Sequence, residues 1–77
     1  MSKKGELKRE IADLEDELEA LEQKRMRSLA ALMTAVVKHT EPDRADLDFF
    51  QTFTDLIDAS RSRLRQMKKE LEELNNK

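Results

Sequence analysis

The chain of 77 residues contains no cysteine, no tryptophan and no tyrosine, and it has one glycine and one proline. Without cysteine there is no disulfide, no thiolate nucleophile and no cysteine-based zinc site. No apolar run approaches the roughly 20 residues of a membrane span, and the basic N-terminus lacks the apolar stretch of a signal peptide. We therefore expect a cytoplasmic protein with no membrane contact.

What the chain has in abundance is charge. Charged residues make up 42% of the sequence and aromatic residues only 4%, while the net charge is −2. This composition is typical of long helices and coiled coils, although disordered chains share it. The near balance of charge exerts no strong pull on nucleic acid or on an acidic membrane. Periodicity has to decide between helix and disorder.

Apolar residues in the first half of the chain alternate in steps of four and three, the heptad pattern of a narrow helix–helix seam. These residues are Leu7, Ile11, Leu14, Leu18 and Leu21. Arg25 then interrupts the stripe, which resumes on a shifted and wider face. That face comprises Met26, Leu29, Leu32, Met33, Val36 and Val37. Extra apolar positions beside a seam indicate packing against more than one helix.

The second half of the chain repeats the heptad, broken only by a serine. Its stripe comprises Phe50, Phe53, Ile57, Ser60, Leu64, Met67, Leu71 and Leu74. Pro42 separates the two stripes, and proline fits the first turn of a helix but not its interior. Thr40 can cap the second helix with Asp43 completing a capping box, and Asp43 is the rival cap.

The sequence therefore predicts an all-α protein, a single two-helix antiparallel hairpin over residues 6–75. We expect a flexible N-terminus over residues 1–5, a first helix over about 6–39, a turn over about 39–43 and a second helix over about 43–75. Charge order supports the antiparallel pairing, because the acidic residues between 13 and 22 come to lie beside the basic residues between 61 and 69. We interpret Arg25 as a device for pairing specificity, opposite Asp58 or Asp55.

A partner is expected, because two helices of this size rarely bury enough apolar surface to be stable alone. The turn-proximal half carries more apolar residues than one facing helix can cover, and exposed patches of this kind favour association. We expect a homodimer whose turn-proximal halves form a four-helix bundle, and another helical protein is the alternative partner. The predicted interface comprises Leu29, Leu32, Met33, Val36, Phe49, Phe50, Phe53, Leu56 and Ile57.

The sequence offers no catalytic residue, no metal site and no cofactor site. His39 stands at the expected end of the first helix, where a histidine can bond the free carbonyl groups. The carboxylate clusters lack the loop geometry that gathers six or more oxygens around calcium. We interpret these residues as structural, and we expect the protein not to be an enzyme.

The function that these features indicate is a non-enzymatic interaction or oligomerisation module, such as an adaptor, a small chaperone or a regulatory protein. The alternative is a dimeric helical bundle that binds RNA or DNA. Rop-like regulators are such bundles, and the resemblance is limited to the hairpin form. In this alternative, the residues of the chain that contact the nucleic acid would be Lys24, Arg27, Arg61 and Arg65. Interleaved acids and the lack of tyrosine and tryptophan for base stacking make this the weaker hypothesis.

Overall fold

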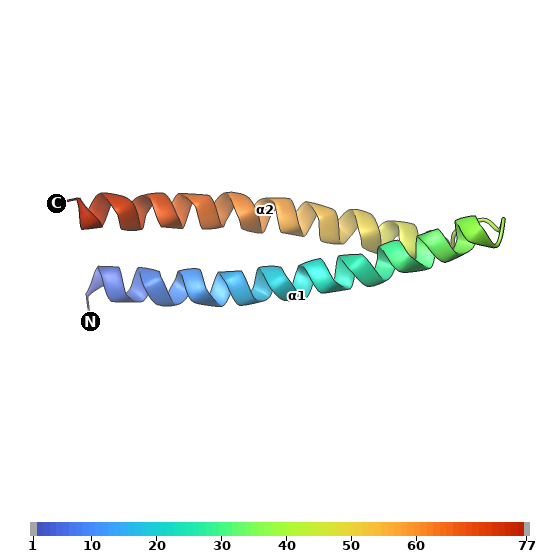
Figure 1. Ribbon diagram of the computed structural model, residues 1–77. Helices are drawn as coiled ribbons and strands as arrows, with labels where there is room; N and C mark the ends of the chain where they lie inside the picture. The colour runs from blue at the N-terminus through green and yellow to red at the C-terminus, as the bar shows by residue number, and fades with distance from the viewer. Residues whose placement is uncertain (1, 77) are drawn as a thin grey trace.

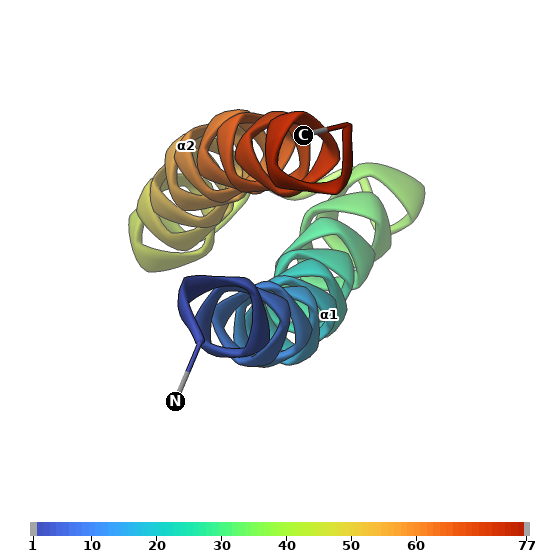
Figure 2. The ribbon, with the colours of Figure 1, turned by 90° about the vertical axis from the view of Figure 1, so that its left-hand side faces the viewer.

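The protein is described by a computed structural model over residues 2–76. Two helices, α1 (Lys3–Val37) and α2 (Arg44–Asn75), lie side by side and run in opposite directions, joined by a short turn (Figure 1). The described chain measures 58 × 16 × 16 Å, so it is a rod. The end-on view shows the two helices winding around one another (Figure 2). The predicted all-α hairpin is confirmed.

Helix α1 begins earlier than the sequence predicts. Ser2 is the N-cap, since its Oγ accepts a hydrogen bond from the Gly5 backbone N–H at 3.1 Å. The Ser2 carbonyl also accepts the Glu6 N–H at 3.1 Å, which closes the first turn. The expected flexible segment 1–5 is therefore wrong for residues 3–5, which are helical because a capping serine precedes them. Met1 lies outside the described residues.

The end of α1 is closed by its own backbone. His39 adopts a left-handed conformation with φ 56°, and its N–H donates to the Val36 carbonyl at 3.1 Å. The Thr40 N–H donates to the Ala35 carbonyl at 2.9 Å, and the Thr40 hydroxyl reaches the same oxygen at 3.3 Å. This pair of backbone bonds is a Schellman motif. It ends the helix at Val37, two residues before the expected position.

Helix α2 is capped by Asp43 and not by Thr40. The Asp43 carboxylate accepts the Ala45 N–H at 3.1 Å, and its carbonyl accepts the N–H groups of Asp46 and Leu47. Thr40 is unavailable because its hydroxyl and its N–H both bond α1. The predicted alternative cap is therefore the one that the chain uses, and the predicted helix boundary shifts by one residue.

One continuous heptad seam holds the helices together. Every residue at a seam position is buried or half-buried. In α1 these positions are Leu7, Ile11, Leu14, Leu18, Leu21, Arg25, Ser28, Leu32 and Ala35. In α2 they are Asp46, Phe50, Phe53, Ile57, Ser60, Leu64, Met67, Leu71 and Leu74. The main apolar cluster lies in the half near the chain ends, where α1 contributes a leucine or isoleucine at each seam position.

The predicted change of face after Arg25 is wrong. Arg25 is half-buried and Ser28 is only 8% exposed, so the seam of α1 passes straight through both residues. The more apolar Met26 and Met33 are 64% and 59% exposed instead. A continuous helix keeps its phase, and α2 holds a strict heptad along its whole length. The phase set by the leucine zipper near the ends therefore overrides the local apolar pattern.

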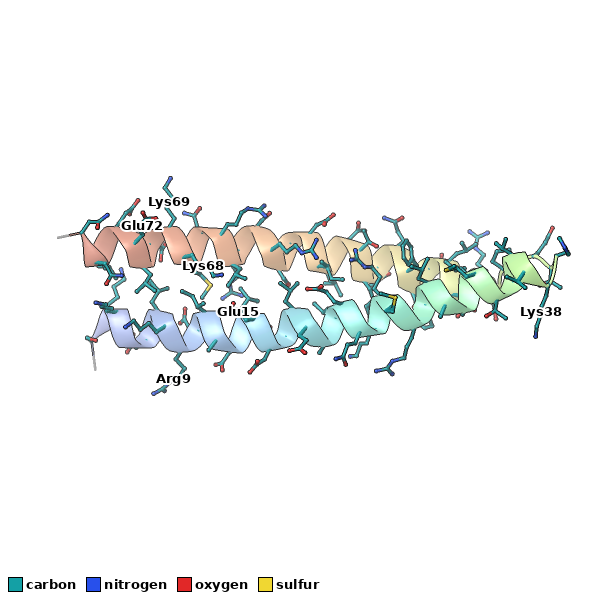
Figure 3. All side chains as sticks on the ribbon, viewed as in Figure 1. Arg9, Glu15, Lys38, Lys68, Lys69 and Glu72 are labelled. Carbon is teal, nitrogen blue, oxygen red and sulfur yellow. The ribbon has the colours of Figure 1, made fainter. Side chains whose placement is uncertain are left out.

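Two ion pairs cross between the helices on one side of the seam. Lys68 Nζ lies 3.6 Å from Glu15 Oε2, and Arg61 Nη2 lies 3.6 Å from Glu22 Oε2. Lys68 and Glu15 point toward one another between the helices, whereas Lys69 projects outward (Figure 3). The pairs connect the acidic part of α1 to the basic part of α2, as the antiparallel prediction requires. Both are exposed, so each contributes about 0–1 kcal/mol.

Heptad spacing extends each side of the seam toward the turn, because residues seven apart on these helices share a face. We call the side with the ion pairs the ion-pair flank. It comprises Glu15, Glu22, Leu29 and Val36 in α1 and Lys68, Arg61, Thr54 and Leu47 in α2. On the other side, Glu17 and Arg63 line one shallow pocket. We call this side the opposite flank, and it comprises Glu10, Glu17, Lys24 and Ala31 in α1 and Glu70, Arg63, Leu56 and Phe49 in α2.

Candidate functional site

The half of the hairpin nearest the turn exposes its apolar side chains. We define this turn-proximal half as residues 24–37 of α1 and 44–59 of α2. It contains every large apolar side chain that is exposed among residues 2–76. These side chains are Met26, Leu29, Met33, Val36, Val37, Leu47, Phe49 and Leu56. The half near the chain ends has none in the described part of the chain, so the molecule is divided into a zipped arm and an apolar head.

The sequence prediction treats the head as one surface, but helix geometry divides it. Leu29 and Val36 lie on the ion-pair flank, and Met33 stands between them at helical spacing of four and three. Phe49 and Leu56 lie on the opposite flank. The two groups project to different sides of the rod. A single flat partner surface therefore cannot cover both.

Four predicted interface residues belong to the seam. Ile57 is 0% exposed and is the most deeply buried side chain of the described chain, so it is unavailable to a partner in the folded hairpin. Leu32, Phe50 and Phe53 are half-buried against the facing helix. These large side chains fill the seam between the helices, because three of the α1 seam positions in this half are Arg25, Ser28 and Ala35.

Two details mark the α2 side of the head. The rings of Phe49 and Phe53 are stacked one turn apart, with centroids 6.2 Å apart and planes inclined by 20°. This contact fixes the exposed Phe49 ring against a half-buried neighbour. The Thr54 hydroxyl is buried on the ion-pair flank and has no hydrogen-bond partner within residues 2–76. Such an orphan hydroxyl costs about 1–3 kcal/mol, so the flank is not optimised as a simple solvent-facing surface.

The four basic residues proposed for nucleic-acid contact do not converge. Lys24 lies on the opposite flank with Arg27 beside it, whereas Arg61 lies on the ion-pair flank with Arg65 beside it. Arg61 is paired with Glu22, and Arg65 donates a hydrogen bond to the Ser62 hydroxyl at 3.0 Å. One phosphate backbone cannot follow both sides of the rod at once. The arrangement gives this hypothesis no support.

Sequence reasoning missed three exposed residues of the head. Met26 and Val37 belong to the shifted face but not to the predicted interface, and Leu47 belongs to neither. Leu47 lies seven residues before Thr54 and fourteen before Arg61. The spacing from the basic residues that pair with α1 is the signal that could have assigned it to the same side as Leu29 and Val36.

Two small pockets lie in the arm. One of about 130 Å³ is lined by Glu10, Asp13, Leu14, Glu17, Arg63 and Met67, and one of about 260 Å³ is lined by Lys3, Glu70, Glu73 and Leu74. Both are smaller than the roughly 300–1,000 Å³ usual for small-molecule sites. Within the described range, no three histidine, aspartate or glutamate side chains are grouped as metal ligands.

Neither α1 nor α2 has the length of uninterrupted apolar sequence that crossing a membrane requires. Comparison of the chain with protein-family models, with curated proteins and with solved structures finds no match.

Proposed function

We propose that this chain is a non-enzymatic protein–protein interaction module that oligomerises through the turn-proximal half of its hairpin. The observation that carries the proposal is that the eight large apolar side chains exposed among residues 2–76 all lie in the head. Burying each of them in an interface would contribute on the order of 1 kcal/mol. An adaptor, a small chaperone or a regulator acting by helix association would use such a surface.

Charge distribution supports the same conclusion. Residues 28–37 carry no charge, the longest such run in a chain that is 42% charged. Most of this run is exposed, including Ala30, Met33, Thr34, Val36 and Val37. A helix face kept free of charge over almost three turns is suited to contact with another helix and not to solvation alone.

The test is the mass of the protein in solution. Sedimentation equilibrium from micromolar to millimolar concentration should show a mass above the 9.0 kDa of one chain. A variant with one lysine in each flank of the head, Met33→Lys with Leu56→Lys, should remain at 9.0 kDa and keep its helical circular dichroism. Both replaced residues are exposed, so the hairpin itself should be unaffected.

The matched control places two lysines in the arm at the exposed alanines, Ala12→Lys with Ala20→Lys. This control changes net charge by the same amount and should associate like the wild type. A wild-type protein that stays at 9.0 kDa throughout, or a control that dissociates as the head variant does, would refute the proposal.

A further inference from the structure

Within the head, the ion-pair flank is complementary to a second, antiparallel copy of the same flank. Along α1 its apolar stripe is Met26, Leu29, Met33 and Val36, spaced by three, four and three residues. This spacing reads the same in both directions. A second α1 lying antiparallel would therefore set Met26 against Val36 and Leu29 against Met33, with every apolar residue facing another.

The same flank of α2 is complementary in charge. Its head positions, spaced by three and four, are Arg44, Leu47, Gln51, Thr54 and Asp58. An antiparallel copy of α2 centred on Gln51 would bring Arg44 beside Asp58 of the other copy at two symmetric places. Within one chain Arg44 and Asp58 are fourteen residues apart on a helix, about 21 Å, and cannot pair.

The two centres lie at one level of the hairpin. The α1 stripe is centred on residue 31. Counting nine residues on from Glu22 and nine back from its partner Arg61 reaches Ala31 and Thr52. Thr52 is one residue, about 1.5 Å, from Gln51. A single two-fold axis at this level can therefore serve both helices.

The opposite flank is not complementary in charge to a second copy of itself. Within the head the charged residues of this flank are Lys24 and Arg27, and no acid stands at its positions there. Two copies joined through this flank would bring only positive charges together. Like charges at an interface are unfavourable, so charge selects the ion-pair flank for symmetric pairing.

We propose that the partner of the ion-pair flank is a second copy of this chain, bound about a two-fold axis that crosses this flank between Leu29 and Met33 of α1 and near Gln51 of α2. This inference rests on the proposed function and specifies its partner and geometry. In the dimer α1 packs antiparallel on α1, α2 packs antiparallel on α2, and the arms extend in opposite directions. The contact is isologous, so it closes at two copies.

Single lysine variants separate the flanks. Met33→Lys should weaken the dimer by at least a hundredfold in Kd, because it places two charges in a dry helix–helix contact. Leu56→Lys changes a residue on the opposite flank that is also exposed, and this variant should dimerise like the wild type. If Leu56→Lys dissociates the protein and Met33→Lys does not, this geometry is wrong while association through the head still stands.

Charge exchange tests the antiparallel register. Arg44→Asp and Asp58→Arg should each raise Kd about tenfold, since each converts two attractive pairs into repulsive ones. The double variant should return Kd to near the wild-type value, because the exchanged charges pair again between copies. Circular dichroism confirms that each variant folds. A double variant that is as weak as the two single losses combined overturns the proposed register.

Discussion

His39 is the one residue among 2–76 whose backbone lies in the left-handed region without being glycine. Its φ of 56° allows the N–H groups of His39 and Thr40 to close the end of α1. Left-handed backbone costs a residue with a Cβ about 1 kcal/mol or more, whereas glycine adopts it freely. Residue 39 therefore closes the helix through its backbone conformation, while its imidazole is exposed.

Replacing His39 with glycine should therefore stabilise the hairpin. We expect the free energy of unfolding of His39→Gly to rise by about 0.5–1 kcal/mol, measured by urea denaturation. His39→Ala removes the same imidazole but keeps the Cβ, so it should not share the gain. Equal stabilities of the two variants would mean that φ at this residue is not the cause.

Capping shows what local chemistry can and cannot decide from sequence. Both Thr40 and Asp43 are good N-cap types, so composition alone leaves two starts for α2. The choice depends on the preceding helix, because the Schellman closure takes the Thr40 hydroxyl to the Ala35 carbonyl. Ser2 was predictable as a cap by type, but an N-terminal segment rich in lysine and containing Gly5 gives little reason to expect an ordered helix.

At the level of the helices, the phase of α1 decides which residues are inside. The seam residues of the arm, and those of α2 from Phe50 onward, follow directly from the heptad pattern in the sequence. In the second half of α1 the apolar pattern favours Met26, Leu29 and Met33, but these residues are exposed because the helix is continuous. The candidate surface could be predicted as a set of residues. Its division into two flanks could not, since that division depends on the phase.

Because α1 keeps this phase, Arg25 occupies a seam position, where it should lower stability relative to an apolar residue. A polar residue at one seam position is a common device that fixes register at some expense of stability. We expect Arg25→Leu to raise the free energy of unfolding by about 1 kcal/mol, because leucine would bury apolar area at this half-buried seam position. Thermal denaturation at equal protein concentration measures the change.

The control for this variant is Arg27→Leu, which makes the same substitution at an exposed position of the same helix. Arginine and leucine have similar helix propensity, so its effect should stay within about 0.5 kcal/mol. Loss of stability in Arg25→Leu would show that the guanidinium makes a favourable contact in the seam. The pairing of Arg25 with Asp58 or Asp55 stays a prediction, as the ion pairs of residues 2–76 that we describe join other partners.

The whole molecule is a rod with unlike ends. Its arm is zipped by leucines and exposed ion pairs, and its head holds apolar side chains away from the seam. On the proposed function, the arm provides stability and the head provides the surface for association. A substitution in the arm should chiefly alter unfolding, whereas one on the head surface should chiefly alter binding.

Small-angle X-ray scattering should report the proposed assembly directly. The Met33→Lys variant should give a radius of gyration close to the 17.3 Å of one hairpin, raised slightly by side chains and hydration. The wild type should give about 22 Å, because an axis at the level of residue 31 displaces the centre of each hairpin by about 13 Å along the rod at 1.5 Å per residue. A dimer near 19 Å would instead require hairpins that overlap along their full length.

Because the helices are antiparallel, residues near both ends of the described chain lie at the same pole of the rod, opposite the turn (Figure 1). A fluorophore or affinity tag fused to either terminus therefore stays far from the surface proposed to bind. Donor and acceptor dyes placed at the two ends of one chain would remain close whether or not the protein associates. Dyes that are to report association belong near residue 40, where the chain reverses.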